Sequence, residues 1–278
     1  MKKYTKFKTQ VFSRHPSHNI LRSELPLLPF RSVIRLGSTT ASNPKLKRTE
    51  LNSAQSVKYS SNKRVMKVCF DAFEVKNPDW FIYDDINDLF INCRDTTNVD
   101  KDEMPFPLII KHVNGSRGTG NYMVYNVDEL YQFIENKNIS KYIFEKYYTY
   151  SREYRLHVTK HGCFYTCRKM LKNETPQHLR FQRHDDNCVW IVEENNSFDK
   201  PVNWNLIVDD CVKALASLSG DIMAFDVKVQ SARKPNGSLR TDPKWIVIES
   251  CSAPSFGDIT AKKYIEQIPI LLKEKNLQ

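Results

Sequence analysis

Apolar residues along this chain recur with two spacings, one typical of helices and one typical of strands. Over residues 62–73, Val65, Met66, Cys69 and Phe70 recur at helical spacing, which predicts a helix. Asn126 followed by Glu129 is typical of a capping box and predicts the start of another. Further helices are predicted over residues 53–59, 84–91, 204–219 and 261–275.

Short runs of β-branched and aromatic residues predict strands, which dominate the middle of the chain. These runs cover residues 33–36, 80–83, 108–111, 122–125, 142–148, 153–159, 163–170, 222–230 and 245–249. The first 29 residues are basic, rich in hydroxyl groups and broken by prolines, so we expect little regular structure before Phe30. The order of elements predicts a mixed α+β fold without internal repeats.

Candidate functional residues are most concentrated in the stretch PFPLIIKHVNGSRGTGN, residues 105–121. An apolar strand ends at Lys111, and Gly115, Gly118 and Gly120 punctuate the loop that follows. The residues beyond this loop favour a strand, whereas Walker and Rossmann loops have other glycine spacings and open a helix. Glycines let backbone N–H groups approach phosphate oxygens, and a lysine at the end of a strand supplies a fixed positive charge. The alternative is an ordinary hairpin with a surface lysine.

Composition favours a folded protein with acidic partners. The 278 residues suffice for one large or two modest domains, and 40% are hydrophobic. Lysine and arginine number 42 against 32 acidic residues, a net charge of +10, which favours nucleotides, nucleic acid or carboxylates as partners. The excess is concentrated in residues 1–48, which we interpret as a solvated basic arm.

Cysteines and hydropathy point to the cytoplasm. The seven cysteines form no CxxC pair, so reduced thiols in a cytosolic protein are the simplest account. No apolar run reaches the roughly 18 residues of a membrane helix, and no apolar segment follows the basic N-terminus as in a signal peptide. We therefore expect a soluble, cytoplasmic protein without a membrane partner; the sequence does not indicate its oligomeric state.

Together these pieces resemble the ATP-grasp superfamily of glutathione synthetase, D-alanine:D-alanine ligase and the RimK-type glutamate ligases, over roughly residues 50–262. The resemblance implies two α+β lobes with ATP between them. It divides the chain into a basic arm with a shortened pre-ATP-grasp segment, residues 1–60, and an ATP-grasp domain, residues 61–278. The segment VIRLGSTT is similar to the start of RimK-like proteins of phages and bacteria.

The resemblance also assigns the nucleotide contacts. Lys63 in SNKRVMKVCF and Lys111 in IIK correspond to the two lysines that reach ATP phosphates. The loop GSRGTG corresponds to the lid over the phosphates, and YIFEKYY to the hinge around adenine; Glu153 in SREYRLHV matches the ribose-binding carboxylate. The lid and hinge residues so implied are Gly115, Ser116, Gly118, Gly120, Glu145, Lys146, Tyr147 and Tyr148.

Catalytic and metal roles follow in the same way. The basic residues facing the transferred phosphoryl group and the acyl phosphate correspond to Arg155, Arg168 and Lys169, and those bordering the acceptor to Arg183 and His184.

Asp226 and Glu249 lie within apolar strands, where an unpaired carboxylate is costly, which favours Mg²⁺ ligands. The family pattern at the second strand is Glu-x-Asn, but this chain has Cys251 in the third position. A thiol is a soft, poor ligand for Mg²⁺.

The predicted function is an ATP-dependent carboxylate-amine ligase that forms an acyl phosphate and acts on small-molecule or peptide substrates. One alternative within the superfamily is a phosphotransferase acting on a hydroxyl group. A second is a nucleotide-responsive module that binds nucleic acid through the basic arm, which the lack of aromatic residues interleaved with the charges weakens.

Overall fold

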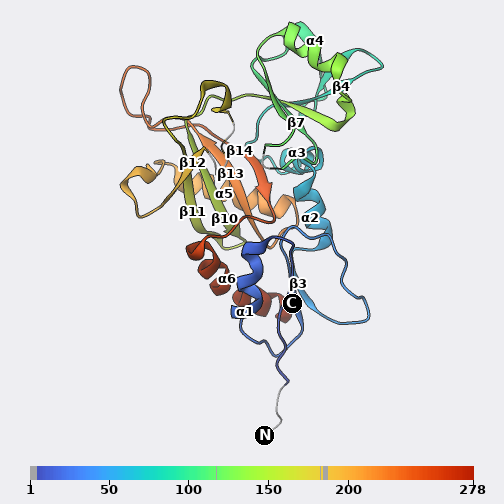
Figure 1. Ribbon diagram of the computed structural model, residues 1–278, viewed down its shortest axis with the longest axis vertical. Coiled ribbons are helices and arrows are strands. Elements are labelled where there is room, and N and C mark those ends of the chain that lie inside the picture. The colour runs from blue at the N-terminus through green and yellow to red at the C-terminus, as the bar shows by residue number, and fades with distance from the viewer. Residues whose placement is uncertain (1–4, 117, 182, 184–186) are drawn as a thin grey trace.

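Three β-sheets are stacked along the long axis of the molecule (Figure 1). The computed structural model describes residues 5–116, 118–181, 183 and 187–278. The fold is α+β, as predicted. The α-helices are α1 (Asn19–Glu24), α2 (Ala54–Ser61), α3 (Lys63–Ala72), α4 (Val127–Asn136), α5 (Trp204–Ser217) and α6 (Asp258–Leu277). The 3-10 helices are η1 (Pro16–His18), η2 (Lys101–Glu103), η3 (Ile139–Lys141), η4 (Gln177–Leu179) and η5 (Asn196–Phe198).

The upper sheet in Figure 1 is antiparallel, in the order β6-β5-β4-β9-β7-β8, and α4 packs on it. Its strands are β4 (Trp80–Asp84), β5 (Leu89–Asn92), β6 (Asn98–Val99), β7 (Leu108–His112), β8 (Asn121–Val124) and β9 (Tyr142–Lys146). The predicted strand-loop-strand arrangement around the glycines is confirmed by β7 and β8. The predicted cap of α4 is confirmed too, since Asn126 Oδ1 accepts a hydrogen bond from the Glu129 N–H at 2.9 Å.

The helix predicted over residues 84–91 is wrong, because this segment forms a turn and then β5. Asp84 Oδ1 accepts a hydrogen bond from the Ile86 N–H at 3.0 Å, and Asp88 adopts a left-handed φ of 55°. A short carboxylate that bonds its own backbone competes with helix formation. Phe90 then buries itself completely in the core of the upper sheet, which favours a strand.

The middle sheet is antiparallel, in the order β12-β11-β10-β13-β14. Its strands are β10 (Arg152–Thr159), β11 (Gly162–Leu171), β12 (Cys188–Val192), β13 (Ile222–Val229) and β14 (Trp245–Cys251). Strand β12 was not predicted. One face of the sheet packs against α5 through an apolar cluster that includes Tyr154, Leu156 and Phe225. Because side chains alternate along a strand, the residues between these point to the opposite face.

The lower sheet is parallel, in the order β1-β2-β3, and packs on α1 and α6 (Figure 1). Its strands are β1 (Gln10–Phe12), β2 (Ser32–Arg35) and β3 (Thr49–Leu51). The prediction of little regular structure before Phe30 is wrong, since β1 and α1 lie there. Leu21 and Leu25 are buried against α6 residues such as Ile268. This tertiary contact stabilises a segment whose local sequence does not favour structure.

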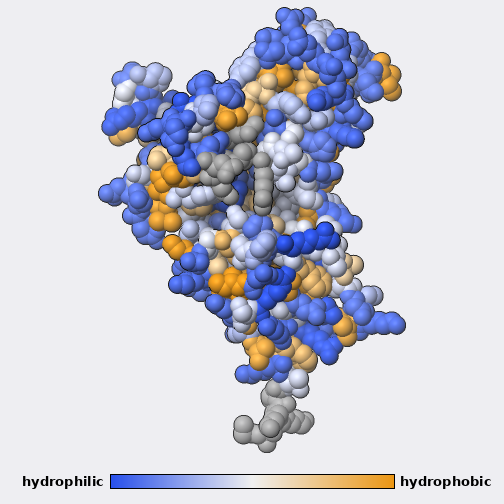
Figure 2. Space-filling model, in the orientation of Figure 1, coloured by the Kyte–Doolittle hydropathy of each residue, from blue (hydrophilic) through white to orange (hydrophobic). Residues whose placement is uncertain are grey.

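The lower and middle layers are joined by specific contacts. The Asn52 side chain donates to Ile222 O at 2.7 Å and accepts from the Asp221 N–H at 2.9 Å. Gly37 has a φ of +71°, and a Cβ built on it would lie 2.6 Å from Ala253 Cβ, so only glycine fits. The face seen in Figure 2 is mainly hydrophilic, with scattered apolar residues. Within the described chain, no helix combines the length and apolar character needed to cross a membrane.

Candidate functional site

Charged side chains lie in rows across the face of the middle sheet that points away from α5. In the first row, Glu153 is paired in register with Lys169 on β11 and Lys228 on β13. Lys169 Nζ donates to Glu153 Oε1 at 3.1 Å, and Arg183 Nε lies 3.5 Å from Glu153 Oε2. Glu153, Lys169 and Lys228 are all buried. The predicted ribose-binding carboxylate is therefore surrounded by cations.

The second row is built on Asp226. Arg155 Nε and Nη2 donate to the two oxygens of Asp226 at 2.8 and 2.9 Å, and Lys169 Nζ donates to Oδ2 at 2.5 Å. Burial opposes the charged carboxylate, but Arg155 and Lys169 outweigh burial and hold the pKa of Asp226 well below its usual range. Asp226 is thus neutralised by cations. The sequence argument for a metal assumed an unpaired carboxylate, and that assumption is wrong.

Glu249 is the more open of the two predicted metal ligands. It pairs in register with Asp226, its side chain is 40% exposed, and one of its oxygens lies 4.0 Å from Lys63 Nζ. Burial raises the pKa of the Cys251 thiol, which makes a thiolate ligand harder to form there. No group of three His, Cys, Asp or Glu side chains that could hold a metal is present in the part of the chain that the structure describes. Of the two predicted metal ligands, Glu249 is the partly exposed one, whereas Asp226 is buried and paired with Arg155 and Lys169.

The third row is neutral. His157 lies in register between Tyr165 and Ala224, and its Nδ1 is 3.1 Å from the Tyr264 hydroxyl. Burial, with a smaller contribution from Arg155, lowers the pKa of His157 to about 3. The imidazole is therefore uncharged near neutral pH. The charge on this face is confined to the two rows nearer the upper sheet.

Helix α3 brings two lysines to the space between the sheets. Lys63, in its first turn, donates to Gly115 O in the glycine loop. Lys67, one turn later, donates to Ile248 O on β14 at 3.0 Å and lies 3.5 Å from Glu145 Oε1 on β9. Burial lowers the pKa of Lys67 to about 8, with Glu145 opposing this shift. The sequence analysis missed Lys67, although its spacing of four from Lys63 places both on one helix face.

Lys111 and Glu145 form a buried ion pair in the upper sheet. Lys111 Nζ donates to Glu145 Oε2 at 2.8 Å, and the exposed fractions of the two residues are 4% and 1%. Burial opposes the charge of Glu145, but Lys111 and Lys67 outweigh burial and lower its pKa. The Glu145 carboxylate is therefore committed to two lysines. Its backbone lies in β9 between β4 and β7, paired in register with Trp80 and Ile109.

The hinge between the sheets begins after Lys146, and its first residues are tied to the upper sheet. The Tyr147 N–H donates to Pro107 O at 2.9 Å. The Tyr148 hydroxyl donates to Asp79 Oδ2 at 2.9 Å, and Lys146 Nζ lies 5.6 Å from the centroid of the Tyr148 ring. The backbone at this crossing is consequently held in place by contacts from both of its tyrosines.

Lys228 is a second residue that the sequence analysis missed. Its Nζ lies 3.4 Å from Tyr148 O and 4.3 Å from the centroid of the Tyr147 ring, and the residue is 8% exposed. Among the described residues, no carboxylate lies within 4.0 Å of this ammonium group. Burial lowers its pKa to about 8, opposed by Glu153. A buried cation without an ion pair is a candidate ligand contact.

Arg168 is separated from the other predicted catalytic residues. It pairs in register with Tyr154, so it points to the α5 face, where Arg168 Nη1 donates to Ser197 O at 2.8 Å and lies 3.5 Å from Asp199. Neighbouring residues on a strand face opposite sides, so Arg168 and Lys169 point to opposite faces of the middle sheet. The grouping of Arg168 with Arg155 and Lys169 is therefore wrong.

The remaining predicted residues lie in loops. Gly118 and Gly120 have positive φ values of 72° and 76°, and the Thr119 N–H donates to Ser116 O at 3.0 Å in a tight turn. Arg183 donates to Lys169 O at 3.2 Å and to Ser151 O at 3.1 Å, which anchors it beside the first row. His184 lies outside the described residues.

The space between the upper and middle sheets therefore carries excess positive charge. Among the described residues, the basic side chains outnumber the carboxylates by three. The basic residues are Lys63, Lys67, Lys111, Arg155, Lys169, Arg183 and Lys228, and the acidic ones Glu145, Glu153, Asp226 and Glu249. Such a site suits a ligand with several negative charges.

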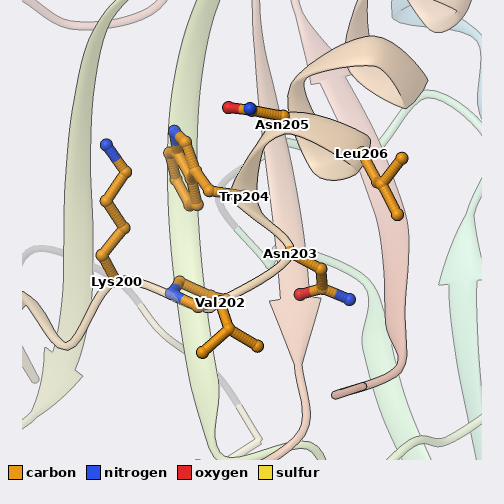
Figure 3. Close-up of a pocket in the computed structure, with 7 residues that line it drawn as sticks. Lys200, Val202, Asn203, Trp204, Asn205 and Leu206 are labelled. Atoms are coloured by element: carbon orange, nitrogen blue, oxygen red, sulfur yellow. The ribbon is translucent and has the colours of Figure 1, made fainter. Parts of the chain in front are cut away.

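A cavity of about 580 Å³ at the start of α5 is a different feature (Figure 3). It is lined by residues 200–206, and Lys200 Nζ lies 5.5 Å from the centroid of the Trp204 ring. No carboxylate lines it, and α5 packs on the apolar face of the middle sheet. The cavity therefore lies on the other side of the sheet from the charged rows.

Several solved structures share this architecture. The match to a D-alanine–D-alanine ligase from Bacillus anthracis covers 98% of this chain and 97% of the ligase chain, with a TM-score of 0.63 and 14% sequence identity. The match to D-alanyl-alanine synthetase A from Vibrio cholerae covers 91% of this chain and 79% of the synthetase chain, with a TM-score of 0.59 and 12% sequence identity. The match to the ATP-grasp ligase PsnB, complexed with a minimal precursor, covers 81% of this chain and 64% of the PsnB chain, with a TM-score of 0.53 and 13% sequence identity.

These likenesses establish the fold. The chain has the ATP-grasp fold, as its sequence resemblance predicted. No protein-family model matches the sequence, and no curated protein matches it either.

Proposed function

We propose that this protein is an ATP-dependent ligase that joins a carboxylate to an amine through an acyl phosphate. The observation that carries the proposal is the excess of three positive charges between the upper and middle sheets of an ATP-grasp fold. A similar ligase from Bacillus anthracis was solved in complex with ATP, with a TM-score of 0.59 and 15% identity, over 88% of this chain and 79% of its own. In this proposal, residues 61–278 are the ATP-grasp unit.

The proposed reaction has two steps. A carboxylate oxygen of the substrate attacks the γ-phosphorus of ATP, the bond to the bridging oxygen breaks, and ADP leaves. The amine then attacks the acyl carbon, the bond to the phosphate oxygen breaks, and an amide and inorganic phosphate form. The amine loses a proton in this step. The released phosphate therefore contains one oxygen atom from the substrate carboxylate.

The side chains between the sheets suit these charges. Lys63 and Lys111 would contact the phosphates of ATP beside the glycine loop. Arg155 and Lys169 would stabilise the negative charge on the transferred phosphoryl group, because a guanidinium fork and an ammonium group match phosphate oxygens. Bound Mg²⁺, held by Glu249, would neutralise further phosphate charge. Glu153 and the hinge tyrosines would contact the ribose and the base.

The test is an oxygen-transfer experiment. The purified protein is incubated with Mg-ATP, an amino-acid pool and carboxylates labelled with ¹⁸O, and the released phosphate and any condensed product are analysed by mass spectrometry. One ¹⁸O atom per phosphate, only when an amine is present, is expected for the ligase. Transfer of the γ-phosphoryl group to a hydroxyl, without phosphate release, would instead identify a kinase. A Lys111→Met protein serves as the negative control.

A further inference from the structure

A second concentration of positive charge lies at the amino ends of the lower sheet. Lys8 lies two residues before β1, Arg31 directly before β2, and Arg48 directly before β3. The three strands are parallel and lie side by side, so their amino-terminal ends meet at one end of the sheet. The topology therefore gathers three basic residues that are far apart in the sequence.

These residues line a cavity of about 330 Å³. Its lining consists of Lys8, Arg31 and Arg48 with Phe7, Gln10, Ser32 and Leu46, and it includes no acidic residue. The carboxyl ends of the same strands face the middle sheet, where Gly37 meets Ala253 and Asn52 bonds to Ile222. The cavity therefore lies at the end of the lower sheet away from the rows of buried charge.

The charges around this cavity are balanced only in part. In the described chain, no carboxylate lies within 4.0 Å of Lys8, Arg31 or Arg48; the nearby Glu50 pairs with Arg35, and Arg48 makes a smaller contribution to lowering the pKa of Glu50. Arg48 Nη1 instead donates to the neutral Gln10 Oε1 at 2.6 Å. Three more basic residues, all exposed, extend the charge along the adjoining segments: Lys6, Lys45 and Lys47. Such a surface attracts a partner with several negative charges.

The aromatic ring in the cavity helps to identify the partner. The Arg31 guanidinium carbon lies 5.2 Å from the centroid of the Phe7 ring, so one face of the ring is covered by a cation. Proteins that bind single-stranded nucleic acid combine a basic groove with several aromatic side chains on which successive bases stack, whereas Phe7 is the one aromatic residue among those lining this cavity. Leu46 offers apolar contact of the kind that a polypeptide side chain fills, and both arginines can bind carboxylates through paired N–H groups.

We propose that this cavity is a docking site for an acidic polypeptide segment, separate from the proposed site of ATP chemistry. Glutamate or aspartate side chains would pair with Lys8, Arg31 and Arg48, and an apolar side chain would rest against Leu46. The proposal does not depend on nucleotide binding, so it can fail or succeed independently of the ligase.

The experiment uses a fluorescein-labelled peptide of nine glutamates around one leucine, with fluorescence anisotropy of the full chain. The triple variant Lys8→Gln, Arg31→Gln, Arg48→Gln should weaken binding by about tenfold or more. The matched control changes three exposed lysines elsewhere, Lys137→Gln, Lys234→Gln and Lys262→Gln, with the same loss of charge. It should change affinity by less than about twofold, because only net charge is altered. Circular dichroism verifies that both variants fold.

Three outcomes would overturn the proposal. Equal weakening by the two triple variants would show a general effect of net charge. Absence of peptide binding at low salt would show that the cavity does not select carboxylates. Tighter binding of a ten-nucleotide oligo-dT than of the peptide, lost in the first triple variant, would identify a nucleic-acid site instead.

Discussion

The two faces of the middle sheet are built from the same strands, and both are buried, but they differ in chemistry. On β10, Tyr154 and Leu156 point toward α5 and are fully buried among apolar side chains. Glu153 and Arg155 alternate with them and point to the opposite face. There the Glu153 carboxylate pairs with Lys169, and the Arg155 guanidinium pairs with Asp226. Burial alone therefore does not distinguish a core from a site.

What distinguishes the faces is the cost of burial. An apolar side chain stabilises the fold by leaving water, by about 1.5–3 kcal/mol. Buried ion pairs are often no more stabilising than apolar residues of the same size, because both charges lose their hydration. A sheet face that keeps such pairs is therefore a candidate ligand-binding face. Five predictions test this difference, and they are ordered by expected effect.

The largest effect is expected from two neighbouring residues on opposite faces, in Asp226→Asn and Phe225→Ala. Each should lower the free energy of unfolding by about 3–5 kcal/mol, the first by leaving Arg155 without its counter-charge and Lys169 with Glu153 alone, and the second by opening a cavity. Only Asp226→Asn should abolish ATP turnover, because Arg155 and Lys169 lose the carboxylate that positions them for the transferred phosphoryl group. Nucleotide affinity should be kept, because the substitution adds net positive charge to the site. Urea unfolding measures the free energy of unfolding, and the shift that ATP causes in it measures the nucleotide affinity. Equal turnover in the two variants would remove the distinction between the faces.

Lys111→Met should weaken nucleotide binding by about tenfold or more. It should also destabilise the fold, because it deprives the buried Glu145 carboxylate of its closest partner. The matched control is the double variant with Glu145→Gln, which removes both charges. The double variant should recover much of the stability without recovering nucleotide affinity, as calorimetry and thermal unfolding can show. Recovery of affinity would mean that Lys111 serves only the ion pair.

Lys228→Met should reduce nucleotide affinity by about threefold to tenfold while leaving stability unchanged or raised. The ammonium group is buried without an ion pair, so an apolar side chain of similar length removes a cost of folding. Lys228→Arg keeps the charge and should retain most of the affinity. Titration of the three proteins with ATP measures the affinity of each. Unchanged affinity in the methionine variant would mean that Lys228 contacts the hinge and does not bind the nucleotide.

A pH dependence follows from the same residue. Burial lowers the pKa of Lys228 to about 8, whereas an unfolded lysine has a pKa near 10.5. Between these values the unfolded chain binds more protons, so Lys228 makes stability rise with pH. Nucleotide affinity should instead fall as pH rises through 8, because the cation is lost. Lys228→Met should flatten this fall in part, since Lys67, with a pKa of about 8, still titrates.

The smallest effect is expected at Cys251. Cys251→Ser should change ATP turnover by less than about twofold, and Cys251→Asn should maintain or raise it at limiting Mg²⁺, because an amide oxygen is a harder ligand than a thiol. Glu249→Gln serves as the comparison and should abolish turnover. An inactive Cys251→Ser enzyme beside an active Glu249→Gln enzyme would contradict this view of the metal site.

The elements with strong periodicity could be predicted from sequence. The helix α3, the β7 and β8 pair and the cap of α4 depend on local patterns, and each has the expected form. In the lower sheet, the strand predicted over residues 33–36 is β2, but β1 and β3 were not predicted, because they have three residues each and are stabilised by contacts with α6. Short strands leave too few residues for a period to be recognised.

The candidate site residues come from motifs, and a motif does not show which residues each one contacts. Motifs located Lys63, Lys111 and Asp226, but the partners of these residues come from other strands and helices. Lys67 and Lys228 look like ordinary lysines in sequence, and only the fold shows that they are buried. The placement of Arg168 failed because a motif names neighbouring residues without separating the two faces of a strand.

The lower sheet also has a consequence for how the chain folds during synthesis. Its apolar face is completed by α6, where Tyr264, Ile268 and Leu271 pack on residues such as Leu21 and Ile34. The first 52 residues therefore leave the ribosome long before the helix that covers them exists. Until residues 258–277 emerge, this segment exposes apolar side chains, which favours contact with chaperones. Closing the lower layer should be a late event in folding.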